Sequence, residues 1–432
     1  MITKPKGTYD IYGSEAKKWQ YVNDIIDAFC SYYNYDYIRT PIFESTELFH
    51  RTSGEDSDIV KKETYDFKDK GERPLTLRPE GTAGVVRSYI ENKMYGDAEK
   101  PVKLYYNGTM YRYERPQSGR NREFTQFGIE VLGSNDPYID AEIISLPIRI
   151  YEALGLSNLK VNINSLGDKE SRKNYTEALI KYLEKDIDNL CDDCKRRLKT
   201  NPLRILDCKV DQESNIIKNA PKITDYLNEE SKNRFDKVLN YLDALDIDYT
   251  IDPNTVRGLD YYDHTVFEIV CDVKELGSSN VIAGGGRYNS LVSELNGPET
   301  PAMGFACGID RLIFALDKLE CNINSKKEMD AFIMYVSETE KEHAIYLAQE
   351  LRLNGFKIEL ENCARSLKAQ FKQADRLNSK FLIILNDEDL KNGELNIKDN
   401  LTKEETKVKE SEIVEYLDMK VDCQIVCVNT NK

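Results

Sequence analysis

The chain contains 432 residues, 75 of them acidic and 60 basic, so its formal net charge at pH 7 is −15. Because 40% of the residues are hydrophobic, the chain can bury packed cores, which excludes a wholly disordered protein. The acidic surplus excludes a general nucleic-acid coat and a membrane-surface protein, although it permits a partner that binds a local basic patch.

The N-terminal part of the chain alternates helical and extended patterns. Residues 14–34 predict a helix, because Trp19 and Val22 begin an apolar series at helical spacing and Ser14 can cap the first turn. An extended segment follows over residues 35–44. Since few helices separate the strands that come next, they predict an antiparallel sheet with helices on one face. These strand-like runs occupy residues 75–78, 102–114, 123–132 and 160–164.

The composition changes twice along the chain, and these changes predict the domain organisation. A middle segment rich in charged residues, Asn and Leu at helical spacing predicts a helical insertion. After a charged linker, short strands and helices alternate, which is typical of a small α/β domain with a mostly parallel sheet. The predicted domains are a core of residues 1–167 and 251–322, an insertion of residues 168–250, and an α/β domain of residues 329–425.

Targeting signals are missing from the sequence as given. No apolar run approaches the roughly 18 residues of a membrane span. The N-terminal segment lacks the apolar core of a signal peptide. We therefore expect a cytoplasmic protein with no membrane partner, whose thiols stay reduced.

One group among the 10 cysteines stands out, formed by Cys191, Cys194 and Cys208. Zinc in proteins usually takes four thiolate or imidazole ligands, and the three histidines of the chain lie elsewhere in the sequence. Because a fourth ligand is missing nearby, we predict no metal site and interpret these residues as buried or incidental thiols. Metal binding by the three cysteines stays open at this point.

A predicted hairpin over residues 108–130 combines arginines with aromatic residues. Arg112 and Glu114 share one face of a strand, and a planar guanidinium can bind a phosphate through two hydrogen bonds. Phe124, on the next strand, can stack on a base. A solvated hairpin with surface charges explains the same residues equally well.

Three further motifs each allow a functional and a structural interpretation. Small residues before Arg311 let a strand turn tightly into a helix, where the arginine is either a ligand-binding or a structural residue. Glu80 and Thr82 suit an ammonium ligand or a helix cap. The glycine run at 283–289, after the peptide Arg257–Tyr262, lacks the spacing of a dinucleotide fingerprint.

The order of these motifs resembles that of the class II aminoacyl-tRNA synthetases, and no class I signature is present. The two peptides Arg257–Tyr262 and 283–289 resemble those that distinguish the histidyl-tRNA synthetases within the class. The resemblance covers nearly the whole chain. It implies an α+β catalytic domain with an antiparallel sheet, a helical insertion, and a C-terminal α/β anticodon-binding domain.

The resemblance also implies a function and an ATP site. The enzyme would activate L-histidine with ATP, accompanied by Mg²⁺, to histidyl-adenylate, and then transfer histidine to the 3′ end of tRNA-His. A guanidinium matches the charge that spreads over phosphoryl oxygens in the transition state. The implied catalytic arginines are Arg112, Arg257 and Arg311; the implied ATP-binding residues are Arg112, Glu114, Phe124 and Arg311.

Histidine and tRNA would be bound by neighbouring residues, and a homodimer is expected from the first class motif. The implied histidine-binding residues are Glu80, Thr82, Arg112, Gln126, Glu130, Arg257, Tyr261 and Tyr262. The implied contacts to the tRNA acceptor end are Gln117, Arg120 and Arg122. His264 follows the histidine peptide, and we do not expect it to be a nucleophile.

Basic residues of the C-terminal domain recur every three or four positions, which predicts one helical face. Within the resemblance this stripe lies near the anticodon; an ordinary solvated face is the alternative. The stripe consists of Arg365, Lys368, Lys372, Arg376 and Lys380. For a second basic run, at residues 195–199, the only role we expect is a contact with a tRNA arm.

Two other functions compete with the ligase. One is a non-catalytic synthetase-like regulatory subunit of ATP phosphoribosyltransferase, which lacks an anticodon domain and typically loses catalytic residues. The retention of Arg112, Arg257 and Arg311 opposes it. The other is a glycyl, prolyl or threonyl synthetase, which would not explain the peptide Arg257–Tyr262.

Overall fold

The structure is a computed structural model that describes most of the chain in two compact units. One unit contains Met1–Tyr12 and Lys18–Ile323, and the other contains the short segment Gly13–Lys17 and the C-terminal residues. The described residues are 1–53, 59–116, 119–157, 159–206, 208, 210–211, 213–256, 261–273, 280–321, 323, 328–363 and 365–421.

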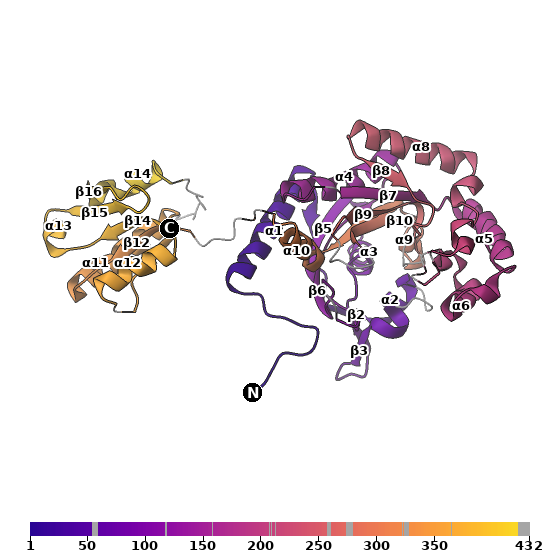
Figure 1. Ribbon diagram of the computed structural model, residues 1–432, viewed down its shortest axis with the longest axis horizontal. Coiled ribbons are helices and arrows are strands. Elements are labelled where there is room, and N and C mark those ends of the chain that lie inside the picture. The colour runs from indigo at the N-terminus through magenta and orange to yellow at the C-terminus, as the bar shows by residue number, and fades with distance from the viewer. Residues whose placement is uncertain are drawn as a thin grey trace. The chain divides into compact units, whose positions relative to one another are not determined.

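An eight-stranded sheet forms the centre of the first unit (Figure 1). The six inner strands pair antiparallel throughout, whereas the two edge strands pair in parallel with their neighbours. This confirms the predicted antiparallel sheet. In sheet order the strands are β1 (Asp36–Tyr37), β5 (Val102–Tyr111), β6 (Glu123–Leu132), β11 (Ala302–Gly308), β10 (Val281–Arg287), β9 (Asp263–Cys271), β7 (Leu159–Ser165) and β8 (Tyr249–Ile251).

Four long helices share a hydrophobic core with one face of this sheet. Side chains alternate between the two faces of a strand, so Phe127 and Ile129 of β6 belong to this core while Glu130 belongs to the opposite face. The second of these helices starts with an aspartate and a proline. Asp136 caps it by accepting a hydrogen bond from the Tyr138 amide, and proline suits the first helical position. The helices are α1 (Gly13–Tyr32), α4 (Pro137–Ala153), α8 (Glu229–Ala244) and α10 (Ile309–Lys318).

Two details of the sequence prediction are wrong. Ser14 does not cap α1, which begins at Gly13 after Tyr12 and has no side-chain cap. Helices also cover the second face of the sheet, where α3 (Thr82–Glu91) and α5 (Lys169–Leu183) contribute to another hydrophobic core. The strands carry apolar side chains on both faces, such as Tyr106 of β5, and these must be buried on both sides.

A small three-stranded sheet directly precedes α3 in the chain. The predicted strand at 75–78 is β4 (Pro74–Leu77), which lies between β2 (Phe43–Ser45) and β3 (Tyr65–Lys68). The helix α2 (Thr46–Ser53) and the π-helical turn η1 (Ile59–Glu63) connect β2 to β3.

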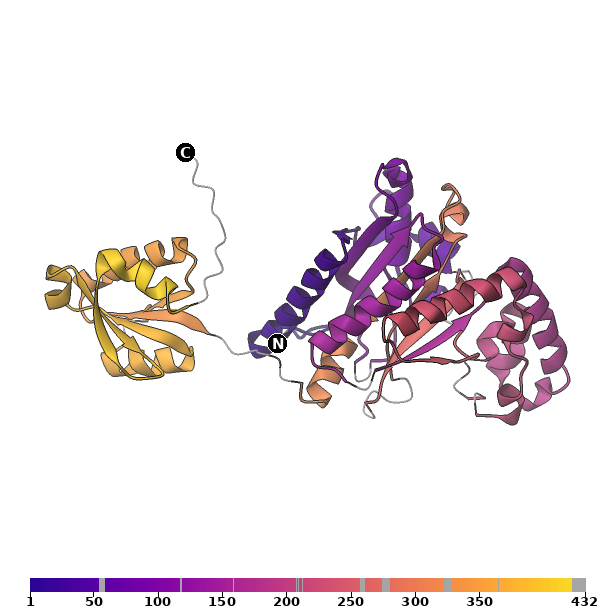
Figure 2. The ribbon, with the colours of Figure 1, turned by 90° about the horizontal axis from the view of Figure 1, so that it is seen from above.

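The predicted insertion is helical, as expected, and its boundaries stay a prediction. Its last helix, α8, lies alongside α4 on the central sheet, whereas the shorter elements gather at one end of that sheet (Figure 2). These elements are α5, η3 (Ile187–Asn189), α6 (Asp192–Thr200), η4 (Pro202–Ile205), α7 (Asn215–Lys218) and η5 (Ile223–Tyr226).

The second unit has its own five-stranded sheet and hydrophobic core. Three parallel strands confirm the predicted α/β character, and two antiparallel strands extend the sheet. Ser337 and Glu340 form a capping box at the start of α11, which fixes where that helix begins. The elements are β12 (Met329–Met334), α11 (Glu338–Leu353), β13 (Ile358–Leu360), α12 (Leu367–Arg376), β14 (Ser379–Ile384), α13 (Asp387–Lys391), β15 (Glu394–Asp399), β16 (Glu405–Lys409), η7 (Glu410–Glu412) and α14 (Ile413–Asp418).

The basic stripe is shorter than predicted. Lys368, Lys372 and Arg376 lie on α12 and are exposed. Arg365 precedes the helix and pairs with the buried Glu361 at 3.1 Å, while Lys380 lies in β14. The periodicity of five basic residues therefore extends beyond the helix, and only three share its face.

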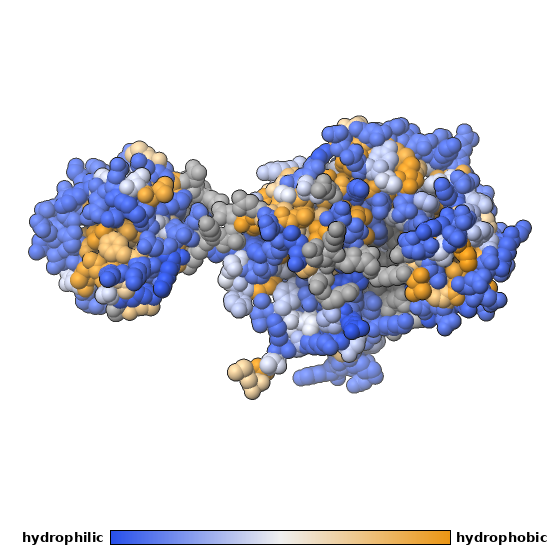
Figure 3. Space-filling model, in the orientation of Figure 1, coloured by the Kyte–Doolittle hydropathy of each residue, from blue (hydrophilic) through white to orange (hydrophobic). Residues whose placement is uncertain are grey.

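The visible surfaces of both units are mainly hydrophilic, with smaller hydrophobic areas (Figure 3). None of the described helices is long and apolar enough to cross a membrane.

A buried network of hydrogen bonds around Asp140 connects the helices α4 and α8 with the strands β9 and β10 of the central sheet. Asp140 of α4 accepts hydrogen bonds from Arg287 Nε at 2.8 Å, from the hydroxyl of Thr265 at 2.7 Å, and from Arg234 Nη2 at 3.2 Å. The side chains of Asp140 and Arg287 are fully buried. Asp140 and Arg287 therefore satisfy each other's buried polar atoms, which water cannot reach.

We expect Asp140→Ala to destabilise the first unit by about 3–5 kcal/mol, because it leaves the Arg287 guanidinium buried without its carboxylate. Urea unfolding, followed on the transition of that unit, measures the loss. Asp136→Ala removes only an exposed helix cap and should cost about 1 kcal/mol. Equal losses for the two variants would contradict the role given to the buried pair.

Candidate active site

Two adjoining pockets open on the face of the central sheet that α3 covers. The larger has a volume of about 280 Å³ and the smaller of about 220 Å³. Arg112, Gln126, Val281 and Arg311 line both pockets, so the two form one divided site. The sequence motifs around the hairpin, the glycine run and the start of α10 therefore meet in space.

Arg112 is held in place at the boundary between the pockets. It directly follows β5, and its Nε donates to the Pro79 carbonyl at 2.9 Å. Its guanidinium carbon lies 5.3 Å from the ring centroid of Phe124 on the paired strand β6. This contact and the hydrogen bond fix the plane of the guanidinium before any ligand binds.

The larger pocket gathers positive charge around an aromatic ring. Arg112, Arg120 and Arg311 line it together with Phe124. Burial lowers the pKa of Arg311 from its ordinary value, and the positive charge of Arg120 lowers it further. Glu114 lies 3.6 Å from Arg120 in the same pocket. Three guanidinium groups beside an aromatic ring suit an anion attached to a flat ring, as in a nucleotide.

Asp310 was not among the predicted site residues, although it directly precedes Arg311 in the strand-to-helix motif noted in the sequence. It lies beside Arg311 at the start of α10, and its carboxylate accepts hydrogen bonds from the Thr125 amide at 2.8 Å and the Asn121 side chain at 3.4 Å. It also accepts a short hydrogen bond from the hydroxyl of Tyr9. Asp310 thereby joins the N-terminal segment and the hairpin to the helix that carries Arg311.

A fully buried carboxyl group, that of Glu130 in β6, lies behind the wall of the smaller pocket, where it contacts the lining residues Thr82 and Tyr288. It accepts a hydrogen bond from the Thr82 hydroxyl at 2.7 Å and a short one from the hydroxyl of Tyr288. Burial raises the pKa of Glu130 to about 8. Gly304 stands opposite in β11, where any side chain would overlap the carboxylate. The glycine is therefore required for the pocket.

Glu80 and Thr82 line this pocket and also have structural partners. The Glu80 carboxylate accepts from the amides of Thr82 and Ala83, each at 2.8 Å, so it caps α3. Burial raises the pKa of Glu80. Gln126 accepts from the Gly81 amide at 3.2 Å. The helix-cap interpretation of Glu80 is correct, and the cap itself faces the pocket.

Three tyrosines complete the wall of the smaller pocket. The ring centroids of Tyr261 and Tyr262 are 4.7 Å apart, and those of Tyr261 and Tyr288 are 5.7 Å apart. Arg172 of α5 donates to the Tyr262 carbonyl at 2.8 Å, which ties the insertion to the pocket. Tyr288 was not among the predicted site residues, although it belongs to the peptide 283–289 noted in the sequence.

Other predicted residues stand apart from the two pockets or outside the described structure. Arg257 and Gln117 lie outside the described residues. The Arg122 guanidinium lies 3.9 Å from the ring centroid of Tyr113 on the hairpin. His264 lines other hollows, and burial lowers its pKa to about 4, so its ring is neutral at pH 7.

The expectation that the three cysteines of the insertion have no fourth partner nearby is wrong. Asp211, three residues after Cys208, brings its carboxylate into their group. Thiolate and imidazole are the commonest zinc ligands, and for that reason the sequence pattern did not single out an aspartate.

An antiparallel sheet that carries an arginine hairpin and a strand-to-helix arginine around one divided pocket defines the catalytic core of a class II aminoacyl-tRNA synthetase. Comparison with known families agrees. Residues 7–312 match the family model described as histidyl-tRNA synthetase, and residues 330–420 match that of an anticodon binding domain. The chain belongs to the histidyl-tRNA synthetase family.

Close relatives cover nearly the whole chain. The histidine–tRNA ligase of Staphylococcus haemolyticus is 49% identical over 421 residues, which are 97% of this chain and 100% of that protein. That of Staphylococcus aureus strain JH9 is 49% identical over 417 residues, 96% of this chain and 99% of the relative. The crystal structure of apo S. aureus histidyl-tRNA synthetase, 45% identical, superposes with a TM-score of 0.82 and covers 96% of this chain and 100% of its own.

A more distant structure shares the fold alone. It is described as an ATP phosphoribosyltransferase regulatory subunit/histidyl-tRNA synthetase from Bacillus halodurans, with 23% identity and a TM-score of 0.63. The match covers 89% of this chain and 98% of that one.

Proposed function

We propose that the protein is a histidine–tRNA ligase, which activates L-histidine with ATP to histidyl-adenylate and transfers histidine to the 3′ end of tRNA-His. The observation that carries this proposal is the divided site, in which Arg112 borders both a nucleotide-sized pocket and a small pocket with a buried carboxylate. Two reactants held on either side of one arginine are oriented for direct reaction.

ATP, together with its Mg²⁺ as the substrate complex, would occupy the larger pocket. Phe124 would stack on adenine, and Glu114 would accept a hydrogen bond from its amino group. Arg112 would hold the α-phosphate and Arg311 the far phosphates, where charge spreads over oxygen atoms in the transition state. The position of the Phe124 ring against Arg112, at 5.3 Å, supports this assignment.

Histidine would occupy the smaller pocket. Glu130 would accept from the imidazole ring, helped by Tyr261, and Glu80 and Thr82 would bind the ammonium group, with Gln126 and Tyr262 beside it. From the family resemblance, Arg257 would act at the α-phosphate. A pocket that pairs polar groups of its substrate rejects apolar analogues, because unmatched buried polar groups cost about 1–3 kcal/mol each.

The tRNA would contact both units. The hairpin loop with Gln117, Arg120 and Arg122 would approach the acceptor end. The domain over residues 330–420 would bind the anticodon, and the exposed basic face of α12 favours contact with phosphates. A homodimer and a cytoplasmic location stay predictions.

A histidine-dependent ATP–pyrophosphate exchange assay tests the proposal. The regulatory-subunit alternative predicts no exchange, and a synthetase of another specificity predicts exchange with another amino acid. The match of residues 330–420 to an anticodon binding domain and the presence of Arg112 and Arg311 in the pockets oppose the regulatory alternative.

Deletion of residues 329–432 should spare part of the exchange activity and abolish efficient charging of tRNA-His. The reason is that the pockets lie within the first unit, while the second unit has its own core. Exchange and charging are measured on the same preparation. Intact charging by the shortened protein would contradict the role of the C-terminal domain.

A further inference from the structure

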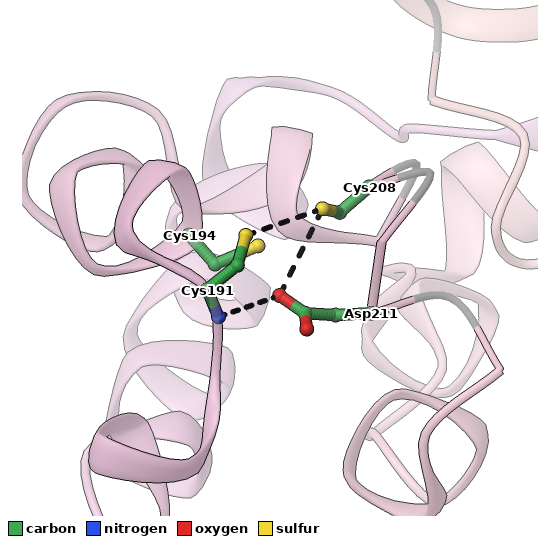
Figure 4. Close-up of side chains that lie close together, drawn as sticks. All are labelled: Cys191, Cys194, Cys208 and Asp211. Atoms are coloured by element: carbon green, nitrogen blue, oxygen red, sulfur yellow. Dashed lines mark hydrogen bonds between the residues drawn. The ribbon is translucent and has the colours of Figure 1, made fainter.

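Three cysteines and one aspartate of the insertion point toward a common centre (Figure 4). Cys191 immediately precedes α6, and Cys194 lies in its first turn. Cys208 and Asp211 come from the segment that follows η4. The three sulfur atoms and a carboxylate oxygen all lie within 4.8 Å of one another.

Two distances within this group are close to the edge lengths of a metal tetrahedron. Cys191 Sγ lies 3.7 Å from Cys208 Sγ, which in turn lies 3.8 Å from Asp211 Oδ2. In a tetrahedral site with Zn–S bonds of about 2.3 Å, the sulfur atoms are about 3.8 Å apart. A disulfide would require about 2.05 Å. The sulfur atoms are therefore spaced for a shared ion and not for a covalent bond.

Most of the group is also shielded from solvent, since three of its four residues are buried and Cys191 is partly exposed. Cys194 is 0%, Cys208 4% and Asp211 8% exposed. The Cys191 amide donates to Asp211 Oδ2 at 3.0 Å, which orients the carboxylate toward the sulfur atoms. Four protein ligands in a closed setting are typical of structural zinc, whereas catalytic zinc keeps an open position.

The chemistry of the donors selects the ion. Thiolates prefer thiophilic divalent ions such as Zn²⁺ over Mg²⁺ or Ca²⁺. Within the described part of the chain, no other group of three or more His, Cys, Asp or Glu side chains is arranged to hold a metal ion.

We propose that Cys191, Cys194, Cys208 and Asp211 bind one Zn²⁺ ion as a structural site of the insertion. The ion ties the start of α6 to the segment after η4. Both segments also contribute to the hydrophobic core that contains α5, the helix whose Arg172 contacts Tyr262. None of the four ligands lines either of the two pockets of the active site. The site therefore does not depend on the proposed function, and failure of the exchange assay would leave it untouched.

Metal analysis of the full-length protein tests the proposal directly. Protein purified without chelators or metal resins should contain one zinc per chain by mass spectrometry. After removal of zinc under reducing conditions, Co²⁺ should bind with one equivalent and produce thiolate-to-cobalt charge-transfer bands together with the d–d absorption of a tetrahedral ion. Protein that contains no zinc and yields no such cobalt spectrum would overturn the proposal, as would a Cys191–Cys208 disulfide found in place of metal.

Variants connect the metal to the four residues. Cys208→Ser and Asp211→Ala should lose zinc, whereas Cys363→Ser, which alters an exposed cysteine of the second unit, should keep it. Asp211→Cys should hold zinc longer than the parent protein against a chelator, because it supplies a fourth thiolate. This last variant keeps a ligand at every position and therefore remains informative if the others do not fold. Unchanged zinc content in both Cys208→Ser and Asp211→Ala would refute the site.

Discussion

Replacing Arg112 by alanine is expected to lower kcat for histidine-dependent ATP–pyrophosphate exchange by about 10²–10³-fold, the usual effect of removing one preorganised donor from a developing charge. Arg112 lines both pockets, and its guanidinium is oriented by the Pro79 carbonyl and the ring of Phe124. The loss should appear in the chemical step, because the α-phosphate gains its new bond beside this residue.

Two further variants make the Arg112 experiment specific. Arg112→Lys keeps the charge but loses the planar pair of donors, so it should recover only a small part of the activity. Arg115→Ala removes an exposed arginine of the same hairpin and should leave kcat within about twofold of the parent, since surface substitutions change little. Similar losses in Arg112→Ala and Arg115→Ala would show that general hairpin charge, and not the position of Arg112, matters.

Replacing Glu130 by glutamine is expected to raise the KM for histidine by about 10–100-fold, which corresponds to the loss of about 1–3 kcal/mol at an unmatched buried polar group. The amide can still accept from Thr82 or Tyr288, whose hydroxyls now contact Glu130. The carboxylate that would pair with the imidazole ring is lost. The KM for ATP should change little, because Glu130 does not line the larger pocket.

Glu114→Gln is the matched control for this prediction. Glu114 lines the larger pocket only, so its loss should raise the KM for ATP and leave that for histidine nearly unchanged. Steady-state exchange assays with each substrate varied in turn measure both constants. If Glu130→Gln raised both KM values equally, the assignment of the smaller pocket to histidine would be wrong.

The same variant should change how stability depends on pH. Burial raises the pKa of Glu130 from its ordinary value of 4.5 to about 8 in the folded protein. Between these values the folded state keeps a proton that the unfolded state has released, so this residue lowers the free energy of unfolding as pH rises from about 4.5 to about 8, and the full stability is present below 4.5.

Glutamine has no such proton, so Glu130→Gln should gain stability relative to the parent as pH rises across that window. Urea unfolding of both ligand-free proteins at the two ends of the window measures the difference. Other buried acids, such as Asp263, whose pKa burial raises to about 6, contribute to both proteins and cancel. A difference that does not vary with pH would contradict the raised pKa.

Local patterns in the sequence were sufficient to predict much of the fold. Strand-like runs with few helices between them predicted the antiparallel sheet, the charged middle segment predicted helices, and alternating strands and helices predicted the C-terminal α/β sheet. Backbone geometry imposes these periods on neighbouring residues, so a single chain displays them. The order of the motifs, with Arg112 and Arg311 in their contexts, indicated the family from the sequence alone.

Contacts between distant residues were decided only by the tertiary structure. Tyr288 meets Glu130 across 158 positions and Asp310 meets Tyr9 across 301, and no local period records such pairs. The stripe on α12 had to lose Arg365 and Lys380, because the helix begins after the first of them and ends before the second. Asp211 lies beside the three cysteines of the insertion because folding brings two segments of the chain together. The order of residues along the chain does not determine which side chains will meet in space.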